Sequence, residues 1–256
     1  MVLWVFRAVT KKSSSNHRIV ARYTIHNMIW MILGLILVAC VFLPGIWVKW
    51  VLKKYSQPAD QYSSQGTGAD LARHLLKKFE LSHVVVEETD KGDHYDPTAR
   101  AVRLSPDYFS GSSLTAITVA AHEVGHALQD ARKEKLFGLR QKLVGVTAKG
   151  ERLGAVLLVA APIILLATRT PYASVIMVLI GFASMATSTL VHLVTLPVEL
   201  DASFNKALPV LEEGNFLQQG DLPNARRILK AAALTYFAGS LASLLNLGRW
   251  LAVLRR

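Results

Sequence analysis

An apolar run near the N-terminus, from about Ile25 to Val48, limits what this chain can fold into more than any other feature. It is long enough for a helix that crosses a bilayer, which needs about 20 apolar residues, and too long for the hydrophobic part of a cleaved signal peptide. We therefore expect a transmembrane helix at 28–52 after a basic N-terminal extension at 1–27, with a kink or an early end at Pro44-Gly45. Aromatic and basic residues of the kind that anchor helices at a membrane interface follow the run: Trp47, Lys49, Trp50, Lys53 and Lys54.

Two later apolar stretches, Leu153–Ala167 and Ala173–Leu196, flank a short turn and predict a transmembrane hairpin at 153–196. A last apolar helix is expected at 229–256. The composition agrees, because 52% of the 256 residues are hydrophobic and the mean hydropathy is +0.31. The net charge of +11 then indicates a lipid bilayer rather than nucleic acid, since no basic stripe alternates with exposed aromatic residues. The single cysteine, Cys40, excludes an intrachain disulfide and leaves histidines and carboxylates as candidate metal ligands.

The segment at 53–152 differs in character from the apolar runs and predicts a separate domain. Apolar residues recur at helical spacing from Ala69 to Phe79. Val84–Val86 and Ala101–Leu104 have the composition of strands, and a turn-rich stretch separates them, so a β-hairpin or small sheet is expected. Residues 205–228 are polar and contain several prolines and glycines, which indicates loops.

A helix from about Leu114 to Asp130, capped by Ser112 or Ser113, carries His122-Glu123-Val124-Gly125-His126. Residues four apart share one face of a helix, so His122 and His126 present two imidazoles to one point. Two neutral imidazoles suit zinc, and Glu123 lies beside them, where it can take a proton from a zinc-activated water. The pattern predicts a zinc-dependent hydrolase with Glu123 as its general base.

A catalytic zinc site needs a third protein ligand. In the elongated metzincin pattern, glycine and histidine would stand at 129 and 132, where this chain has Gln129 and Arg132. The ligand must therefore come from elsewhere, and the segment at 197–228 returns from the predicted hairpin to the side of His122. We expect Glu199 as the ligand and Asp201 as a group that orients a histidine, with the reverse assignment left open.

The segment from Asp93 to Pro97 admits two interpretations. It could form the edge strand that binds an extended peptide, with His94 or Tyr95 stabilising the oxyanion of the transition state. Alternatively, it is a turn held by aspartate side chains.

Several separated motifs together resemble the bacterial membrane neutral zinc metallopeptidases, a family described as YugP-like. The resemblance covers roughly 55–250 and implies a mainly α integral membrane protein with a gluzincin-like α+β zinc peptidase domain and about four apolar helices. It implies His122 and His126 as zinc ligands, Glu123 as the base and a further ligand from the Glu199 segment. The motifs are Asp93–Pro97, Val102–Pro106, Ser113–Ala116, Val119–Gln129, Thr195–Ser203, Glu212–Gly214 and Ala231–Tyr236.

The sequence thus predicts a membrane-bound zinc metalloendopeptidase whose partners are the lipid bilayer and a peptide or protein substrate, a membrane protein among the candidates. The expected location is the bacterial inner (plasma) membrane, with several spans. The basic cluster at 132–152 places the catalytic side in the cytoplasm, although the basic N-terminus argues for the opposite side. The alternatives are a catalytically silent metal-binding scaffold or adaptor, which would not need Glu123, and an intramembrane protease.

Overall fold

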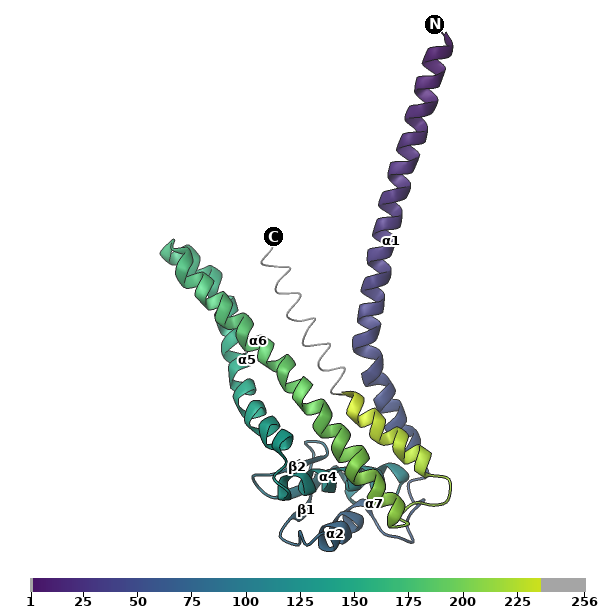
Figure 1. Cartoon of the computed structure of the whole chain (residues 1–256), viewed down its shortest axis with the longest axis vertical. Coiled ribbons are helices and arrows are strands. Elements are labelled where there is room, and N and C mark those ends of the chain that lie inside the picture. Colours follow the sequence, from purple (N-terminus) through teal and green to yellow (C-terminus); the bar gives the residue numbers. More distant parts are fainter. Residues whose placement is uncertain (1, 236–256) are drawn as a thin grey trace. The chain divides into compact units, whose positions relative to one another are not determined.

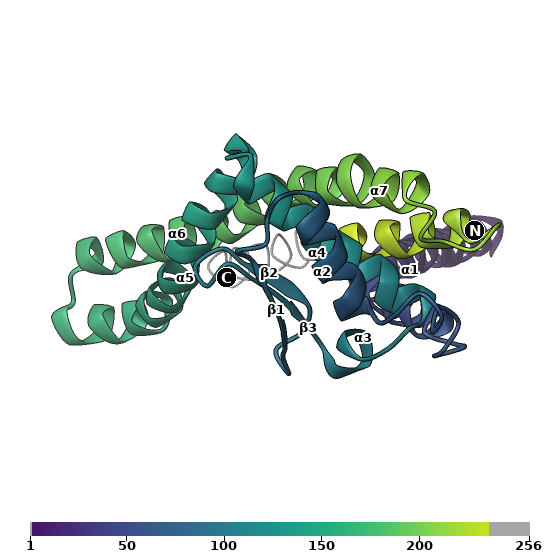
Figure 2. The same ribbon diagram turned by 90° about the horizontal axis from the view of Figure 1, so that it is seen from below.

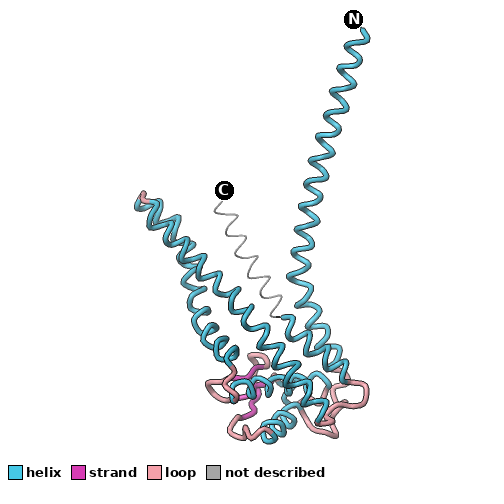
Figure 3. The backbone as a smooth tube through the Cα atoms, in the orientation of Figure 1, coloured by secondary structure: helices cyan, strands magenta, loops and turns pink. Residues whose placement is uncertain are grey.

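The structure is a computed structural model that describes residues 2–235 (Figure 1). Two compact units meet between Leu43 and Pro44. The first consists of most of one long helix, and the second holds the remaining helices and a small sheet (Figure 3).

Helix α1 runs from Val2 to Tyr55, so it begins far ahead of the expected start at 28. The reason is that no glycine or proline precedes Gly34, and nothing in the first thirty residues stops a helix. The expected early end at Pro44 was wrong, because Pro44 lies inside the helix and Val48 and Val51 beyond it are buried in the core of the second unit. The expected kink at Pro44-Gly45 stays a prediction. Large apolar side chains between residues 28 and 46 are exposed, as in a lipid-facing helix: Met28, Ile29, Trp30, Leu35, Ile36 and Phe42.

The sheet contains β1 (Val85–Glu88), β2 (His94–Asp96) and β3 (Ala101–Leu104) in the order β1-β3-β2. A small sheet is confirmed, but β1 and β3 run parallel, so a hairpin between these two strands was wrong. The hairpin joins β2 to β3 instead. The Asp96 carboxylate makes this turn, because it accepts hydrogen bonds from the backbone N–H groups of Thr98 and Ala99.

Helix α4 (Leu114–Ala131) is the centre of the second unit, and every residue from Leu114 to Gln129 is buried. The Ser113 side chain accepts a hydrogen bond from Ala116 N, which confirms the expected cap. Helix α2 (Gly68–Lys78) packs against α4 with its apolar face, and the short helix α3 (Pro106–Phe109) leads into α4 (Figure 2). A helix buried on all sides accounts for the alanine-rich sequence, because small side chains let neighbouring elements come close.

Helices α5 (Lys135–Thr168) and α6 (Pro171–Asp201) form an antiparallel hairpin and lie side by side along much of their length (Figure 1). Arg169 ends α5 in a left-handed conformation, and Pro171 opens α6. Two helices joined by a short turn are present as expected, and α5 includes the basic cluster at 132–152 from Lys135 onward. That this hairpin crosses a membrane stays a prediction. Close packing depends on Gly181, where an added Cβ atom would lie 2.6 Å from a side-chain carbon of Leu158.

Within the described residues, two helices are long and apolar enough to cross a membrane, His26–Tyr55 and Lys135–Thr168. A shorter apolar helical stretch covers Pro171–Gly181. The fourth expected helix, at 229–256, lies mostly beyond residue 235, and only its beginning is described, inside a helix at 222–235.

After α6 the chain stays helical, where loops were expected from residue 205. A π-helix, η1 (Ala202–Ala207), follows Asp201 directly and continues into α7 (Leu208–Glu213). Pro209 does not interrupt this region and stands in the first turn of α7, directly after the π-helix. Short π-helical segments inside longer helices frequently occur at functional sites.

Candidate metal centre

The two histidines of the HExxH motif lie on one face of α4 and are buried. Their ring centroids are 4.7 Å apart, and the rings are nearly perpendicular. The Nε2 atoms of both rings point to the same place, which is the arrangement that the spacing of four residues predicts.

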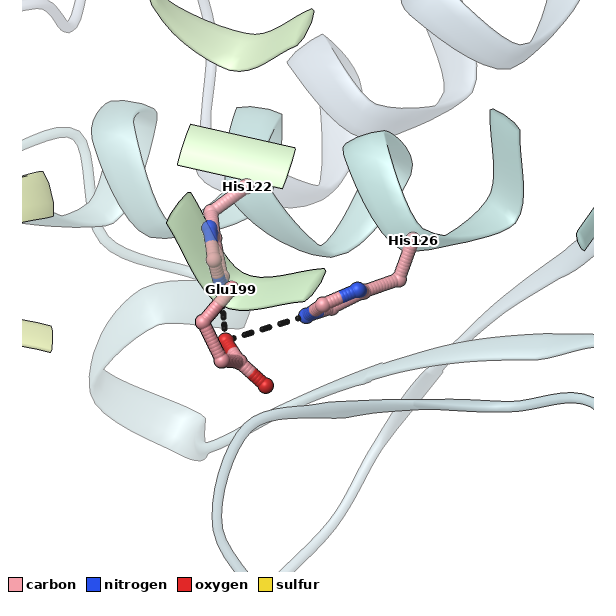
Figure 4. A group of neighbouring side chains, drawn as sticks. All are labelled: His122, His126 and Glu199. Carbon is pink, nitrogen blue, oxygen red and sulfur yellow. Dashed lines mark hydrogen bonds and ion pairs between the residues drawn. The ribbon is translucent and has the colours of Figure 1, made fainter. Parts of the chain in front are cut away.

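Glu199 reaches this place from α6 (Figure 4). Its Oε2 atom lies 3.1 Å from His122 Nε2 and 3.3 Å from His126 Nε2. Ligand atoms at zinc distances in tetrahedral geometry are roughly 3.3 Å apart, so these spacings suit a zinc ion. Among the described residues, His122, His126 and Glu199 form the one group of candidate ligands whose atoms all lie within 4.8 Å of one another.

Helix α4 and the start of η1 touch at Gly125. A Cβ atom on Gly125 would lie 2.8 Å from the carbonyl oxygen of Ala202, closer than two such atoms can approach. Glycine within the motif therefore lets the end of α6 come near enough for Glu199 to reach both histidines.

Gln129, one turn beyond His126, links the two helices by hydrogen bonds. Its Nε2 donates to the Val198 carbonyl at 2.9 Å and to Asp201 Oδ2 at 2.8 Å. Both amide hydrogens are then used, so Oε1 faces His126 Nδ1 at 2.8 Å as an acceptor. The Nδ1 atom of His126 must carry the proton, which leaves Nε2 free to bind a metal ion.

His122 is held in the same way, because Ser203 Oγ lies 3.2 Å from its Nδ1 atom. Ser203 and Glu199 stand four residues apart across the junction of α6 and η1, so one helical face supplies both the candidate ligand and the group that orients a histidine.

Asp201 lies outside the group of candidate ligands. Its carboxylate accepts hydrogen bonds from Gln129 and from Asn205, and it forms an ion pair with Lys206. Burial by itself raises the pKa of Asp201, but these partners outweigh it and hold the pKa at about 2. Asp201 therefore contacts His126 only through Gln129, and its role as an orienting group stays a prediction.

The charge of Glu199 is balanced on both sides. Burial alone raises the pKa of Glu199, but the nearby histidines outweigh burial and lower it. Burial lowers the pKa of His122, whereas its hydrogen bond to Glu199 and the charges of Glu123 and Glu199 raise it overall. On the far side, Arg140 Nη2 lies 3.0 Å from Glu199 Oε1. Glu199 is thus an anion that lies between two histidines and the guanidinium of Arg140.

Glu123 is buried, and its Oε2 atom has no hydrogen-bond partner among the described residues. Burial raises the pKa of Glu123, and the charges of His122 and His126 oppose this. An unpaired buried oxygen is costly unless something else occupies the space beside it. Glu123 borders a cavity of about 170 Å³ together with His122 and Glu199, so a group held in this cavity lies next to the Glu123 side chain.

His94 and Tyr95 lie on β2 and do not line this cavity. The His94 ring is hydrogen-bonded to the carbonyl of Gly92, and the Tyr95 hydroxyl donates to Asp130 at 2.9 Å. Their oxyanion role stays a prediction. Tyr108 and Asp93 line the cavity instead. The sequence singled out Asp93 only as part of the segment that could bind an extended peptide, and it did not single out Tyr108.

The chain was also compared with known proteins. Residues 29–255 match the model of a family described as "Putative neutral zinc metallopeptidase". The chain belongs to this family. Among the curated relatives of this chain is "Putative membrane protease YugP" of Bacillus subtilis (strain 168), which is 35% identical over 209 residues, covering 80% of this chain and 88% of the relative. No solved structure matches. The family resemblance seen in the sequence is confirmed.

Proposed function

We propose that this chain is a membrane-bound zinc metalloendopeptidase of gluzincin-like type. One observation carries the proposal: the ligand atoms of His122, His126 and Glu199 converge, and Glu123, a buried glutamate with an unpaired carboxylate oxygen, lines the same cavity as His122 and Glu199. A purely structural metal site would not need an unpaired buried carboxylate next to its ligands.

Zinc, when bound, supplies a Lewis acid that lowers the pKa of water and polarises the peptide carbonyl. The chain's own contribution starts with Glu123, which is next to His122 in sequence and so lies beside the ligand atoms rather than among them. Its free oxygen accepts a proton from the attacking water and then gives that proton to the amine that leaves. Gln129 holds the His126 ring in the tautomer that presents Nε2, and Ser203 Oγ contacts Nδ1 of His122 and so orients that ring.

We place the enzyme in a plasma membrane, with several spans and with its catalytic site on the cytoplasmic side. Two described helices meet the length and hydropathy of a membrane span, and the relative from Bacillus subtilis is named a membrane protease. Exposed basic residues at the start of the helical hairpin, such as Arg132, Lys133 and Lys135, support the cytoplasmic side, since such residues are enriched there.

The decisive variant is Glu123→Gln in the full chain, purified in detergent and loaded with zinc. We expect bound zinc to stay at the wild-type level and peptide cleavage to fall by at least about a hundredfold, the range that a general base contributes. Glu88→Gln, an exposed carboxylate on β1, is the matched control and should cleave like the wild type. If Glu123→Gln cleaves as well as the wild type, the mechanism is wrong.

Metal content separates this function from its rivals. His126→Ala and Glu199→Ala should each lose zinc, whereas His83→Ala, at an exposed histidine, should keep it. A wild-type protein that binds zinc through these residues and cleaves no peptide would instead be a metal-binding scaffold. An intramembrane protease would cleave only substrates that span the bilayer.

A further inference from the structure

The cavity beside Glu123 has walls of two kinds. The polar kind includes His122, Glu123 and Glu199, the groups assigned to the reaction, together with Asp93, Tyr108 and Thr235. The other kind is apolar and comes from parts of the chain that lie far apart in sequence: Val48 and Leu52 from α1, Val119 from α4, and Ile228, Leu229 and Ala232 from the helix at 222–235.

We propose that this cavity is a specificity pocket for one apolar side chain, of about the size of leucine or phenylalanine, on the residue next to the scissile bond. The inference rests on the proposed function and names its substrate class. The volume supports one side chain of this size, because the cavity holds about 170 Å³ and an apolar cavity of roughly 150 Å³ takes up a benzene molecule.

The pocket adjoins the reacting groups directly. Glu123 and His122 form part of its wall, so a side chain that fills it belongs to a residue at the bond being cut and not to a distant part of the substrate. Filling the pocket also excludes water from one side of Glu123, which strengthens electrostatic interactions with the substrate.

The acidic groups in the wall do not make it a pocket for a basic side chain. The Asp93 Oδ1 atom already accepts hydrogen bonds from the backbone and the hydroxyl of Ser105, at 2.7 and 2.9 Å. Glu199 is paired with the histidines, and Glu123 is reserved for the attacking water. A lysine placed there would lose its hydration against the apolar wall, which carries a large cost in free energy.

Ala232 and Leu52 limit the size of the pocket from different helices. A larger residue at 232 should fill the space, and a smaller one at 52 should extend it. These two changes act in opposite directions on the same substrate series, so a general loss of folding cannot imitate both.

The experiment uses the zinc-loaded full chain in detergent and peptides that differ only in the residue on either side of one scissile bond: Ala, Leu, Phe, Trp or Lys. We expect kcat/KM for Leu or Phe on one side to exceed that for Ala by about 10- to 100-fold, as apolar pockets discriminate by methylene groups. Ala232→Leu should move the preference to Ala, and Leu52→Ala should admit Trp. Ala173→Leu and Leu166→Ala, at exposed positions of the helical hairpin, should change neither preference.

Equal rates for all five peptides, or a preference for Lys, would refute the proposed specificity pocket. The proposed peptidase function would not be affected by that result. Equilibrium binding of the same peptides to Glu123→Gln gives a second measurement that does not depend on turnover. If no peptide is cleaved, the proposed function fails, but peptide binding still tests the pocket. Tighter binding of the Leu and Phe peptides than of the Ala peptide supports the pocket, and equal binding of all three refutes it.

Discussion

A Cβ atom on Gly125 would lie 2.8 Å from the carbonyl oxygen of Ala202, so these two residues mark the closest approach of the HExxH helix to the segment that follows Glu199. Alanine at 125 would push η1 away from α4 and move Glu199 with it. We expect Gly125→Ala to lower the free energy of unfolding by about 1–3 kcal/mol, as overpacking does, and to reduce bound zinc. Thermal unfolding and metal analysis measure the two effects.

The matched control for this change is Gly138→Ala on α5, where an added Cβ atom would meet nothing within 4 Å. That variant should keep its zinc and unfold at the same or a slightly higher temperature, because alanine favours a helix over glycine by roughly 1 kcal/mol. Full zinc binding by Gly125→Ala would show that the close approach is not needed.

Gln129→Met tests the link between His126 and Asp201. Methionine is of similar length but can neither donate to Asp201 nor accept from His126 Nδ1. We expect zinc affinity to fall by about 10- to 100-fold, the usual effect of losing a group that orients a metal ligand. Competition with a chelator measures the dissociation constant, and Gln219→Met, at an exposed position, serves as the control. An unchanged affinity would mean that the ring of His126 needs no such support.

A substitution at Tyr62 should change the stability of the fold without changing the metal centre. This fully buried tyrosine donates to Asp221 Oδ2 at 2.7 Å and accepts from the backbone N–H of Gln218 at 3.1 Å. Tyr62→Phe removes both bonds and should lower the free energy of unfolding by about 1–3 kcal/mol. Zinc affinity should stay at the wild-type value. A parallel loss of zinc affinity would show that the two regions are coupled.

The lowered pKa of Asp96 predicts that the folded state loses part of its stability in acid. The backbone N–H of Ala99, followed by Thr98 and Arg103, holds the pKa of Asp96 below its ordinary value. A lowered pKa stabilises the folded state above the unfolded pKa of about 3.9, and this contribution is lost as the pH falls through the lower folded pKa. When the pH drops below about 4, the melting temperature of Asp96→Asn should therefore fall by less than that of the wild type. Equal losses in both proteins would contradict this account.

Membrane orientation can be tested with single cysteines in a Cys40→Ser background. If the catalytic side is cytoplasmic, an impermeant thiol reagent added to intact cells should label Arg169→Cys, at the turn between α5 and α6. Arg132→Cys, at the end of α4, should react only after the membrane is opened. The reverse labelling would place the catalytic site outside the cell.

The local sequence determined the parts of this protein that depend on neighbouring residues. The spacing of four residues alone brings His122 and His126 to one face of a helix, and Ser113 alone caps its start. A short turn between two apolar stretches was enough to predict a helical hairpin that returns the chain to the histidines. Composition and run length in the same way predicted helices suited to a membrane.

Tertiary structure decided whatever depends on how distant segments pack. The π-helix after Asp201 and the contact at Gly125 set the rotation of α6, and this rotation, which no local pattern records, brings Glu199 and not Asp201 to the histidines. Gln129 gave a local signal, one turn after His126, but its two acceptors lie about seventy residues away. The apolar wall beside Glu123 likewise combines α1 with the helix at 222–235. Such contacts follow from the packing of whole helices, and several arrangements would satisfy the same apolar periodicity equally well.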